Sequence, residues 1–352
     1  MSPHDKSVHA KSVKASAVIF GLAGPVLTPV EAAFFRDINP WGFILFARNV
    51  QNPKQVKRLT SDLREAVGRD CLIFIDQEGG RVQRLRPPHW ANYPSGADYA
   101  FLYEKDKSAG LRATYLAHRL IADDLRSLGI TANCAPVLDI PRPGADPIIS
   151  DRAFGVEVDT IITLAHAATA GLMNGGVAPV IKHIPGHGRA EVDSHKALPM
   201  ISAPADVLDG SDFIPFRAFS DAPMAMTAHA VYSYVDDAPV TLSKKAIKDV
   251  VRGTLGFDGL LMSDDLDMKA LSGNSLETKA VDALRAGCDV VLQCSGQLGD
   301  MVYVAKGVKA LRGKAKERAM MAELAAIPPR RFNRETVKTE FSQLMPDVEL
   351  VA

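Results

Sequence analysis

Groups that can transfer protons gather in one stretch of this chain, residues 180–195, which reads VIKHIPGHGRAEVDSH. An apolar, strand-like run ends there at Lys182 and His183. A turn rich in proline and glycine follows, which argues against a helix, and it leads to Asp193 and His195. A buried strand that ends in charged residues and opens into a polar loop is typical of a site in an α/β barrel.

Asp193 and His195 form the first candidate catalytic pair. The two residues are two positions apart, so an extended segment would place both side chains on one face. A carboxylate beside an imidazole fixes the tautomer of the ring and raises its pKa. Such a pair can donate and accept protons, although the same D-x-H spacing also occurs in structural and metal-binding sites.

Asp264 is the candidate partner for this pair. It lies in LLMSDDLDM, where an apolar run ends, and in isolation it would be read as the cap of the next helix. A carboxylate that faces an Asp–His pair suits a double displacement at an acetal carbon. The carboxylate attacks carbon while the imidazolium protonates the leaving oxygen, and the imidazole then activates water.

Eight apolar runs alternate with helical segments along the chain. This alternation predicts a parallel sheet, and eight such units predict a single-domain (β/α)8 TIM barrel. The expected strands are residues 17–22, 42–46, 71–75, 131–138, 178–181, 224–228, 259–262 and 289–292. The expected helices are residues 28–37, 52–67, 108–128, 159–174, 206–219, 243–254, 276–286 and 299–312.

Polar residues lie at the carboxyl ends of four of these strands. They are Asp76, Lys182, His183, His229 and Asp264, and in a barrel the carboxyl ends of the strands meet at one mouth. We divide the chain into a mobile leader (1–13), the catalytic barrel (14–312) and a peripheral C-terminal extension (313–352).

Composition excludes several classes of protein. The 41 basic residues balance the 41 acidic ones, so nothing indicates a nucleic-acid partner. No apolar run reaches the roughly 18 residues of a membrane span. The four cysteines lack metal-ligand spacing and are read as reduced core thiols. The stretch SAVIFGLAGPVL loosely matches a signal peptide, but it is short, broken and needed as the first strand, so we expect a cytoplasmic protein.

Five motifs carry a resemblance to a known family. IDQEGGRVQRL, FGVEVD, KHIPGHGRAEVDSHKALP, MTAHAVY and GFDGLLMSDDLDM resemble, in order and spacing, the motifs of glycoside hydrolase family 3. The likeness is strongest to the single-domain β-N-acetylglucosaminidases of bacterial cell-wall recycling and covers residues 17–295. The match is loose between the third strand and its helix, and beyond residue 312 nothing useful matches.

The resemblance implies a role for each site residue. Asp264 would be the nucleophile of a retaining enzyme, and His195, paired with Asp193, the acid/base. The sugar would be held by Asp76, Arg84, Arg152, Lys182 and His183. His229 matches a motif histidine that we place in the substrate site without a defined role. Alone, Asp76 would be read as a turn residue, and the two arginines as solvated surface charges.

The resemblance also implies the biological setting. The substrate would be GlcNAc-1,6-anhydroMurNAc, with or without its peptide, cleaved in the cytosol. We expect no cofactor and no metal, and a monomer rather than an oligomer. The natural aglycone, the acceptor (water or phosphate) and the oligomeric state stay open.

Three rival functions follow from the same residues. A metal-dependent barrel hydrolase would use His183, His187, Asp193 and His195 as ligands, but Pro185 and Gly186 prevent the helical spacing of an HExxH site. A β-N-acetylglucosaminide phosphorylase would replace water by phosphate, which a histidine acid/base tolerates better than a carboxylate. The third rival, an inactive sugar-binding module, is disfavoured because the three candidate catalytic residues are all present.

Overall fold

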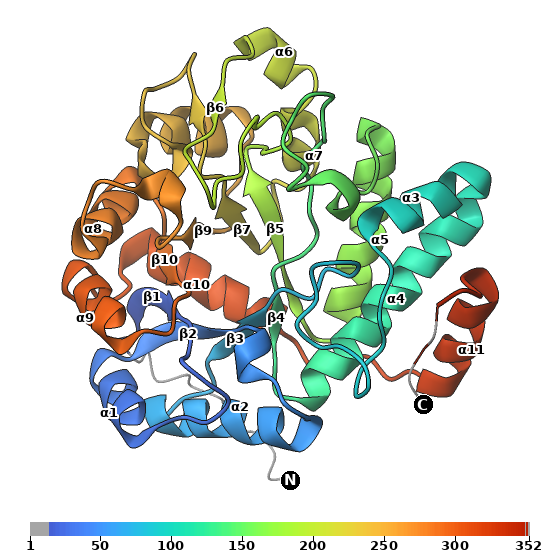
Figure 1. The fold of residues 1–352 in the computed structure, drawn as a ribbon, viewed down its shortest axis with the longest axis horizontal. Helices are drawn as coiled ribbons and strands as arrows, with labels where there is room; N and C mark the ends of the chain where they lie inside the picture. The colour runs from blue at the N-terminus through green and yellow to red at the C-terminus, as the bar shows by residue number, and fades with distance from the viewer. Residues whose placement is uncertain (1–13, 349, 351–352) are drawn as a thin grey trace, which may run out of the picture.

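A computed structural model describes residues 14–348 and residue 350, so the predicted leader (1–13) lies outside the described residues. Its centre is a closed barrel of eight parallel strands, in the order β1-β10-β9-β7-β5-β4-β3-β2, ringed by helices (Figure 1). The (β/α)8 prediction is therefore confirmed. The barrel strands are β1 (Ser16–Phe20), β2 (Pro40–Leu45), β3 (Leu72–Ile75), β4 (Ala132–Asn133), β5 (Ala178–Ile184), β7 (Met224–Thr227), β9 (Leu260–Asp265) and β10 (Val290–Gln293).

The barrel strands are buried on both faces, which explains why the sequence shows continuous apolar runs. All four residues of β3 are buried, for example. One set of side chains fills the barrel interior, including Ile19, Phe74 and Met262. Side chains on the other face pack under the surrounding helices, including Ile73 and Leu261. A separate two-stranded pair, β6 (Met200–Ile201) and β8 (Val231–Tyr232), lies outside the barrel.

The helices begin and end where local chemistry predicts. Thr28 caps α1 and forms a reciprocal capping box with Glu31, and Asn52 caps α2 with Pro53 in its first turn. The helices are α1 (Pro29–Ile38), α2 (Pro53–Val67), α3 (Gly96–Lys105), α4 (Lys107–Ser127), α5 (Val158–Asn174), α6 (Ala205–Asp209), α7 (Phe213–Ala218), α8 (Leu276–Ala286), α9 (Leu298–Gly307), α10 (Gly313–Ala325) and α11 (Arg334–Leu344). Short 3-10 turns η1 (Ala47–Asn49), η2 (Ser150–Arg152), η3 (Val240–Leu242) and η5 (Lys269–Leu271) and a π-helical segment η4 (Ala246–Thr254) complete the list.

Several predicted elements differ from the structure, among them the helix predicted over residues 299–312, which ends at Gly307. The fourth strand is shorter than predicted because Pro136 has no N–H to donate, although residues 135–138 still run beside β5 through Leu138 N–H to Lys182 O (2.8 Å). The loop predicted after β3 contains α3, whose capping box (Ser95 and Asp98) was overlooked. The helix predicted over residues 206–219 is two short helices, because α6 ends at Gly210.

The segment beyond residue 312 packs against the barrel. Ala319 and Ala322 of α10 belong to the same buried cluster as the barrel interior, and Trp41 Nε1 donates to Glu323 (2.8 Å). At the right edge of Figure 1, α11 lies against α4. Arg334 of α11 pairs there with acidic residues of α4. Whether this segment is a separate extension stays a prediction. No helix in the described residues is long and apolar enough to cross a membrane.

Candidate active site

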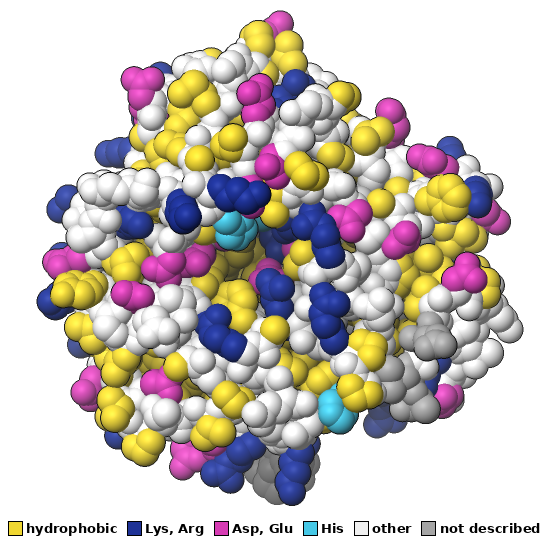
Figure 2. Space-filling view, in the orientation of Figure 1, with side chains coloured by type: hydrophobic (Ala, Val, Ile, Leu, Met, Phe, Trp, Pro, Cys, Tyr) yellow, Lys and Arg dark blue, Asp and Glu magenta, His cyan; other side chains and the backbone are white. Residues whose placement is uncertain are grey.

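A pocket opens at the carboxyl ends of the barrel strands. In Figure 2 it is a central hollow with Lys, Arg and His side chains around its mouth. Seven of the nine predicted site residues line it: Asp76, Arg84, Arg152, Lys182, His183, His195 and Asp264. The other two, Asp193 and His229, lie behind lining residues. The strand ends therefore converge as the barrel fold requires.

Asp76 is the centre of a charged cluster on one wall of the pocket. It follows β3 and accepts from Lys182 Nζ (2.9 Å) and Arg84 Nη2 (3.1 Å). Burial by itself raises the pKa of Asp76, but the two cations outweigh burial and hold that pKa well below its usual range. An ionised carboxylate bonded to two cations can bind the hydroxyl groups of a polar ligand.

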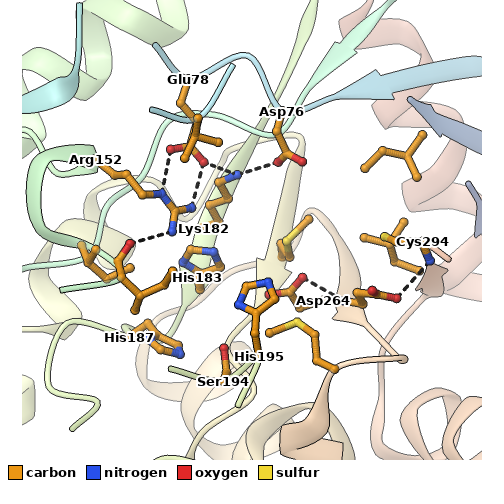
Figure 3. A pocket seen from close by; sticks show the side chains of 18 of the residues that line it. Asp76, Glu78, Arg152, Lys182, His183, His187, Ser194, His195, Asp264 and Cys294 are labelled. Atoms are coloured by element: carbon orange, nitrogen blue, oxygen red, sulfur yellow. Dashed lines mark hydrogen bonds and ion pairs between the residues drawn. The ribbon is translucent and has the colours of Figure 1, made fainter. Parts of the chain in front are cut away.

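Glu78 joins the same cluster and was not among the predicted site residues. It accepts two hydrogen bonds from Arg152, both 2.8 Å, and lies 2.6 Å from Lys182 Nζ (Figure 3). Burial by itself raises the pKa of Glu78. The opposing effect of Arg152 and Lys182 is larger and lowers this pKa to about 2. The second carboxylate balances the charge of cations that are almost entirely withdrawn from water, because an unpaired buried cation would be costly. Its place in DQEGG, two residues after Asp76, was the available signal.

Asp139 is a second overlooked residue and fixes the backbone and ring of His183. Asp139 Oδ2 lies 2.6 Å from His183 Nδ1, and the carboxylate also accepts from the backbone N–H groups of His183 and His187. Burial raises the pKa of Asp139, but its bonds with His183 outweigh burial and lower it. With Nδ1 held by the carboxylate, Nε2 is the ring nitrogen of His183 that a ligand can reach.

Asp264 is half-buried at the carboxyl end of β9 and lines the pocket. Its Oδ1 accepts from the backbone N–H of Asp265 (2.8 Å), and no described residue donates to its second oxygen. Burial raises the pKa of Asp264, but His229 and His183 oppose burial and leave the pKa below its usual value. Asp264 is therefore an ionised carboxylate with one oxygen free to react.

His229 was predicted to bind substrate, but the structure places it behind Asp264. Its side chain is fully buried and outside the pocket lining. Nδ1 bonds the Thr241 hydroxyl (2.7 Å) and Nε2 the Asp265 carbonyl (3.0 Å), so both ring nitrogens are already used. Both ring nitrogens are therefore bonded within the protein, and a contact between His229 and substrate stays a prediction.

His195 and Asp193 form a hydrogen-bonded pair at the mouth. Asp193 Oδ1 accepts from His195 Nδ1 (2.8 Å) and also from the His195 backbone N–H (2.9 Å). The predicted extended geometry is wrong, because the backbone turns here, with Lys196 N–H bonded to Asp193 O. The His195 side chain is 63% exposed, which leaves Nε2 free to exchange protons. Burial raises the pKa of Asp193, but its hydrogen bonds with His195 lower it.

The loop that carries these residues is fixed at its beginning and exposed further on. Tyr232 donates to the carbonyl of Gly186, and Arg189 Nε donates to Asp212 (2.8 Å). A side chain on Gly188 would collide with the Ile140 carbonyl, at 1.9 Å. By contrast, Glu191 and Val192 are exposed. The loop thus has a rigid base and an exposed tip that leads into the Asp193–His195 pair.

The described residues contain no group of three or more His, Cys, Asp or Glu arranged to hold a metal ion. Of the four histidines and aspartates that a metal-dependent rival would use, His183 is bonded to Asp139 and His195 to Asp193.

Comparison with known proteins gives the family. The N-terminal domain of glycosyl hydrolase family 3 matches residues 31–327, past residue 295 and through α10. The β-hexosaminidase of Alkalilimnicola ehrlichii is 37% identical over 281 residues, which cover 79% of this chain and 80% of that protein. The β-hexosaminidase of Xanthomonas axonopodis pv. citri is 35% identical over 313 residues, 87% of this chain and 90% of that protein.

A solved structure agrees with the sequence relatives. NagZ from Neisseria gonorrhoeae, in complex with N-trifluoroacetyl-D-glucosamine, is 30% identical and superposes with a TM-score of 0.82. The likeness covers 95% of this chain and 97% of that one. With a family match over most of the barrel and relatives aligned along most of their length, the chain belongs to glycoside hydrolase family 3.

Proposed function

We propose that this enzyme is a retaining exo-β-N-acetylglucosaminidase. One observation carries the proposal: a half-buried, ionised carboxylate, Asp264, and an exposed imidazole, His195, oriented by Asp193, belong to the same pocket. The names of the relatives support a β-linked N-acetylhexosamine as the substrate. The N-trifluoroacetyl-D-glucosamine bound to the gonococcal NagZ supports a GlcNAc-like sugar.

In the first step, an oxygen of Asp264 attacks C1 of the sugar as the bond to the glycosidic oxygen breaks. The leaving oxygen takes the Nε2 proton of the His195 imidazolium, which gives an alcohol and a neutral imidazole. In the second step, water attacks C1, gives its proton to His195, and Asp264 leaves as a carboxylate. Two displacements restore the β configuration.

The charged wall is proposed to hold the sugar hydroxyls. Asp76 accepts from hydroxyl groups while Lys182 and Arg84 keep it ionised. The Glu78–Arg152 pair lines the same pocket and bonds to this wall through Lys182. His183 offers Nε2 from the end of β5. Each of these groups is held by another, so little ordering of side chains opposes binding.

We propose the cytosolic muropeptide GlcNAc-1,6-anhydroMurNAc, with or without its peptide, as the natural substrate, and a role in peptidoglycan recycling. The motifs that resemble the cell-wall recycling enzymes support this choice, as does the overall likeness to the gonococcal NagZ. The proposed enzyme acts as a cytoplasmic monomer without a cofactor.

A trapped intermediate tests the mechanism. With a slow 5-fluoro derivative of a β-GlcNAc glycoside, mass spectrometry of a digest should find the sugar attached to the peptide that contains Asp264. An adduct on another peptide, or an inverted anomeric product, would contradict the role given to Asp264. In the same preparation, turnover of nitrophenyl β-GlcNAc with and without phosphate distinguishes hydrolysis from phosphorolysis, since only a phosphorylase would release the sugar as its 1-phosphate.

Hydrogen exchange tests the proposed behaviour of the loop. The anchoring of the loop predicts that the amides of Glu191 and Val192 exchange quickly in the free enzyme and slow when a GlcNAc-based inhibitor binds, because the exposed tip has few fixed contacts. Amides of Gly186 and His187 should be protected in both states, since Gly186 N–H bonds His183 O and His187 N–H bonds Asp139. Equal protection of the tip with and without inhibitor would show that His195 is already fixed.

A further inference from the structure

His187 is a buried polar residue that has no partner within the protein. Its side chain lines the pocket, the residue is 4% exposed, and neither ring nitrogen has a hydrogen-bond partner among the described residues. Its ring lies 5.7 Å from that of His183, and Figure 3 shows it on the side of His183 away from Asp76. Because buried polar groups are almost always bonded, an unpartnered pair of nitrogens at a pocket wall indicates a ligand.

The backbone holds this ring where it is. Asp139 accepts from the His187 backbone N–H (2.7 Å), Tyr232 holds Gly186, and the close approach of Gly188 to Ile140 fixes the following residue. These contacts fix the backbone from which the imidazole projects into the pocket.

The ring is neutral and can both donate and accept. Burial, with a smaller contribution from His183, lowers the pKa of His187 to about 4. A neutral imidazole carries one N–H donor and one acceptor nitrogen. It matches a ligand group that offers one acceptor and one donor.

The other residues that line the pocket limit which chemical group of a ligand can bind His187. Ile148 and Ile149 line the same pocket, and Arg152 donates to Ile148 O (3.1 Å) as well as to Glu78, so its guanidinium is largely occupied. Elsewhere the lining is apolar around Phe46 and Leu292. The pocket that His187 lines thus offers a free donor and acceptor together with apolar side chains, which fits an N-acetyl group with its N–H, C=O and methyl.

We infer that His187 determines specificity by hydrogen-bonding the acetamido group at C2 of the sugar. The inference rests on the proposed function, which places C1 at Asp264 and the sugar hydroxyls at Asp76. With those two ends fixed, the C2 substituent lies next to the reacting carbon, on the side where His183 and His187 follow one another along the chain.

Substrate selectivity tests the inference. The kcat/KM values of the wild type, His187→Phe and His187→Gln are compared on nitrophenyl β-GlcNAc and nitrophenyl β-glucoside. His187→Phe keeps a flat ring without nitrogens and should lower kcat/KM for the GlcNAc substrate by about 10- to 100-fold, the effect of losing one or two hydrogen bonds. On the glucoside the loss should be about threefold or less by the same reasoning, since a hydroxyl at C2 does not reach the wall. His187→Gln, which restores a donor and an acceptor, should recover most of the selectivity.

His118→Gln is the matched control, because His118 is also buried with a lowered pKa but bonds Thr114 and lies outside the pocket lining. It should leave the GlcNAc-to-glucoside ratio as in the wild type. Equal losses on both substrates for His187→Phe would overturn the inference while leaving the proposed hydrolase intact. A wild type that fails to cleave the GlcNAc substrate would overturn both.

A binding measurement covers the case in which His187→Phe does not fold. In wild-type enzyme with ¹⁵N-labelled histidine, the ring resonances of His187, assigned by their loss in His187→Gln, should shift when GlcNAc is added and stay unmoved with glucose. Unmoved resonances in the presence of saturating GlcNAc would overturn the inference.

Discussion

Asp264→Ala is expected to lower kcat on nitrophenyl β-GlcNAc by roughly 10⁴-fold, the scale seen when an enzyme loses its nucleophile. The physical reason is that no other described carboxylate in the pocket combines ionisation with a free oxygen in this position. Asp76 and Glu78 are bonded to cations, and burial raises the pKa of Asp265 to about 7, so much of it is protonated at neutral pH. Steady-state kinetics at pH 7 measure the loss, and a thermal melt close to that of the wild type shows that the fold is kept.

Added azide makes this experiment specific to the role of Asp264. With the carboxylate removed, a small anion can enter from the face that Asp264 occupied and displace the nitrophenolate. The product should be the α-glycosyl azide, because a single displacement inverts the anomeric carbon. Formation of the β-glycosyl azide by Asp264→Ala would instead assign Asp264 to acid/base catalysis.

His195→Ala should harm the enzyme most where the leaving group is poor. A nitrophenolate departs with little protonation, whereas a sugar alkoxide must be protonated as its bond breaks. We expect about 10²- to 10⁴-fold loss on a GlcNAc disaccharide, the usual contribution of a general acid, and a much smaller loss on nitrophenyl β-GlcNAc. Some loss of activity should persist on both substrates, because hydrolysis of the glycosyl-enzyme also needs a base. The measurement is kcat/KM on the two substrates side by side.

Asp193→Ala should show the same leaving-group bias as His195→Ala. Asp193 holds the ring through Nδ1, so without it the imidazole loses the carboxylate that fixes its tautomer and its orientation. The double variant should be little worse than the worse single variant, because the two residues act as one unit. Lys196→Ala is a suitable control, since Lys196 lies 3.7 Å from Asp193 and is 75% exposed, so its pairing contributes little.

A uniform slowing of both substrates by His195→Ala and Asp193→Ala would remove His195 from the acid role. Azide also tests the acid/base role of His195. A variant that lacks the acid/base residue should form the β-glycosyl azide, because azide takes the place of water in the second displacement. Absence of that product would point to another proton donor at the mouth.

Much of the scaffold followed from local features of the sequence. Continuous apolar runs gave the barrel strands because strands buried on both faces need no polar alternation. Caps such as Thr28 and Asn52 marked helix starts because they bond backbone groups only a few residues away. The polar residues at strand ends, Asp76 and Asp264 among them, converge in one pocket as parallel strands in a barrel require.

Contacts between distant residues were decided by the tertiary structure alone. Glu78 is 74 residues from Arg152 and Asp139 is 44 from His183, and no spacing rule connects such partners. His229 illustrates the opposite case, since its motif position suggested a ligand contact while Thr241 and the Asp265 carbonyl occupy both its nitrogens. His187, by contrast, is left without a partner by the same packing. The sequence determines which groups reach the mouth of the barrel, whereas packing determines which of their hydrogen-bonding atoms remain free for a ligand.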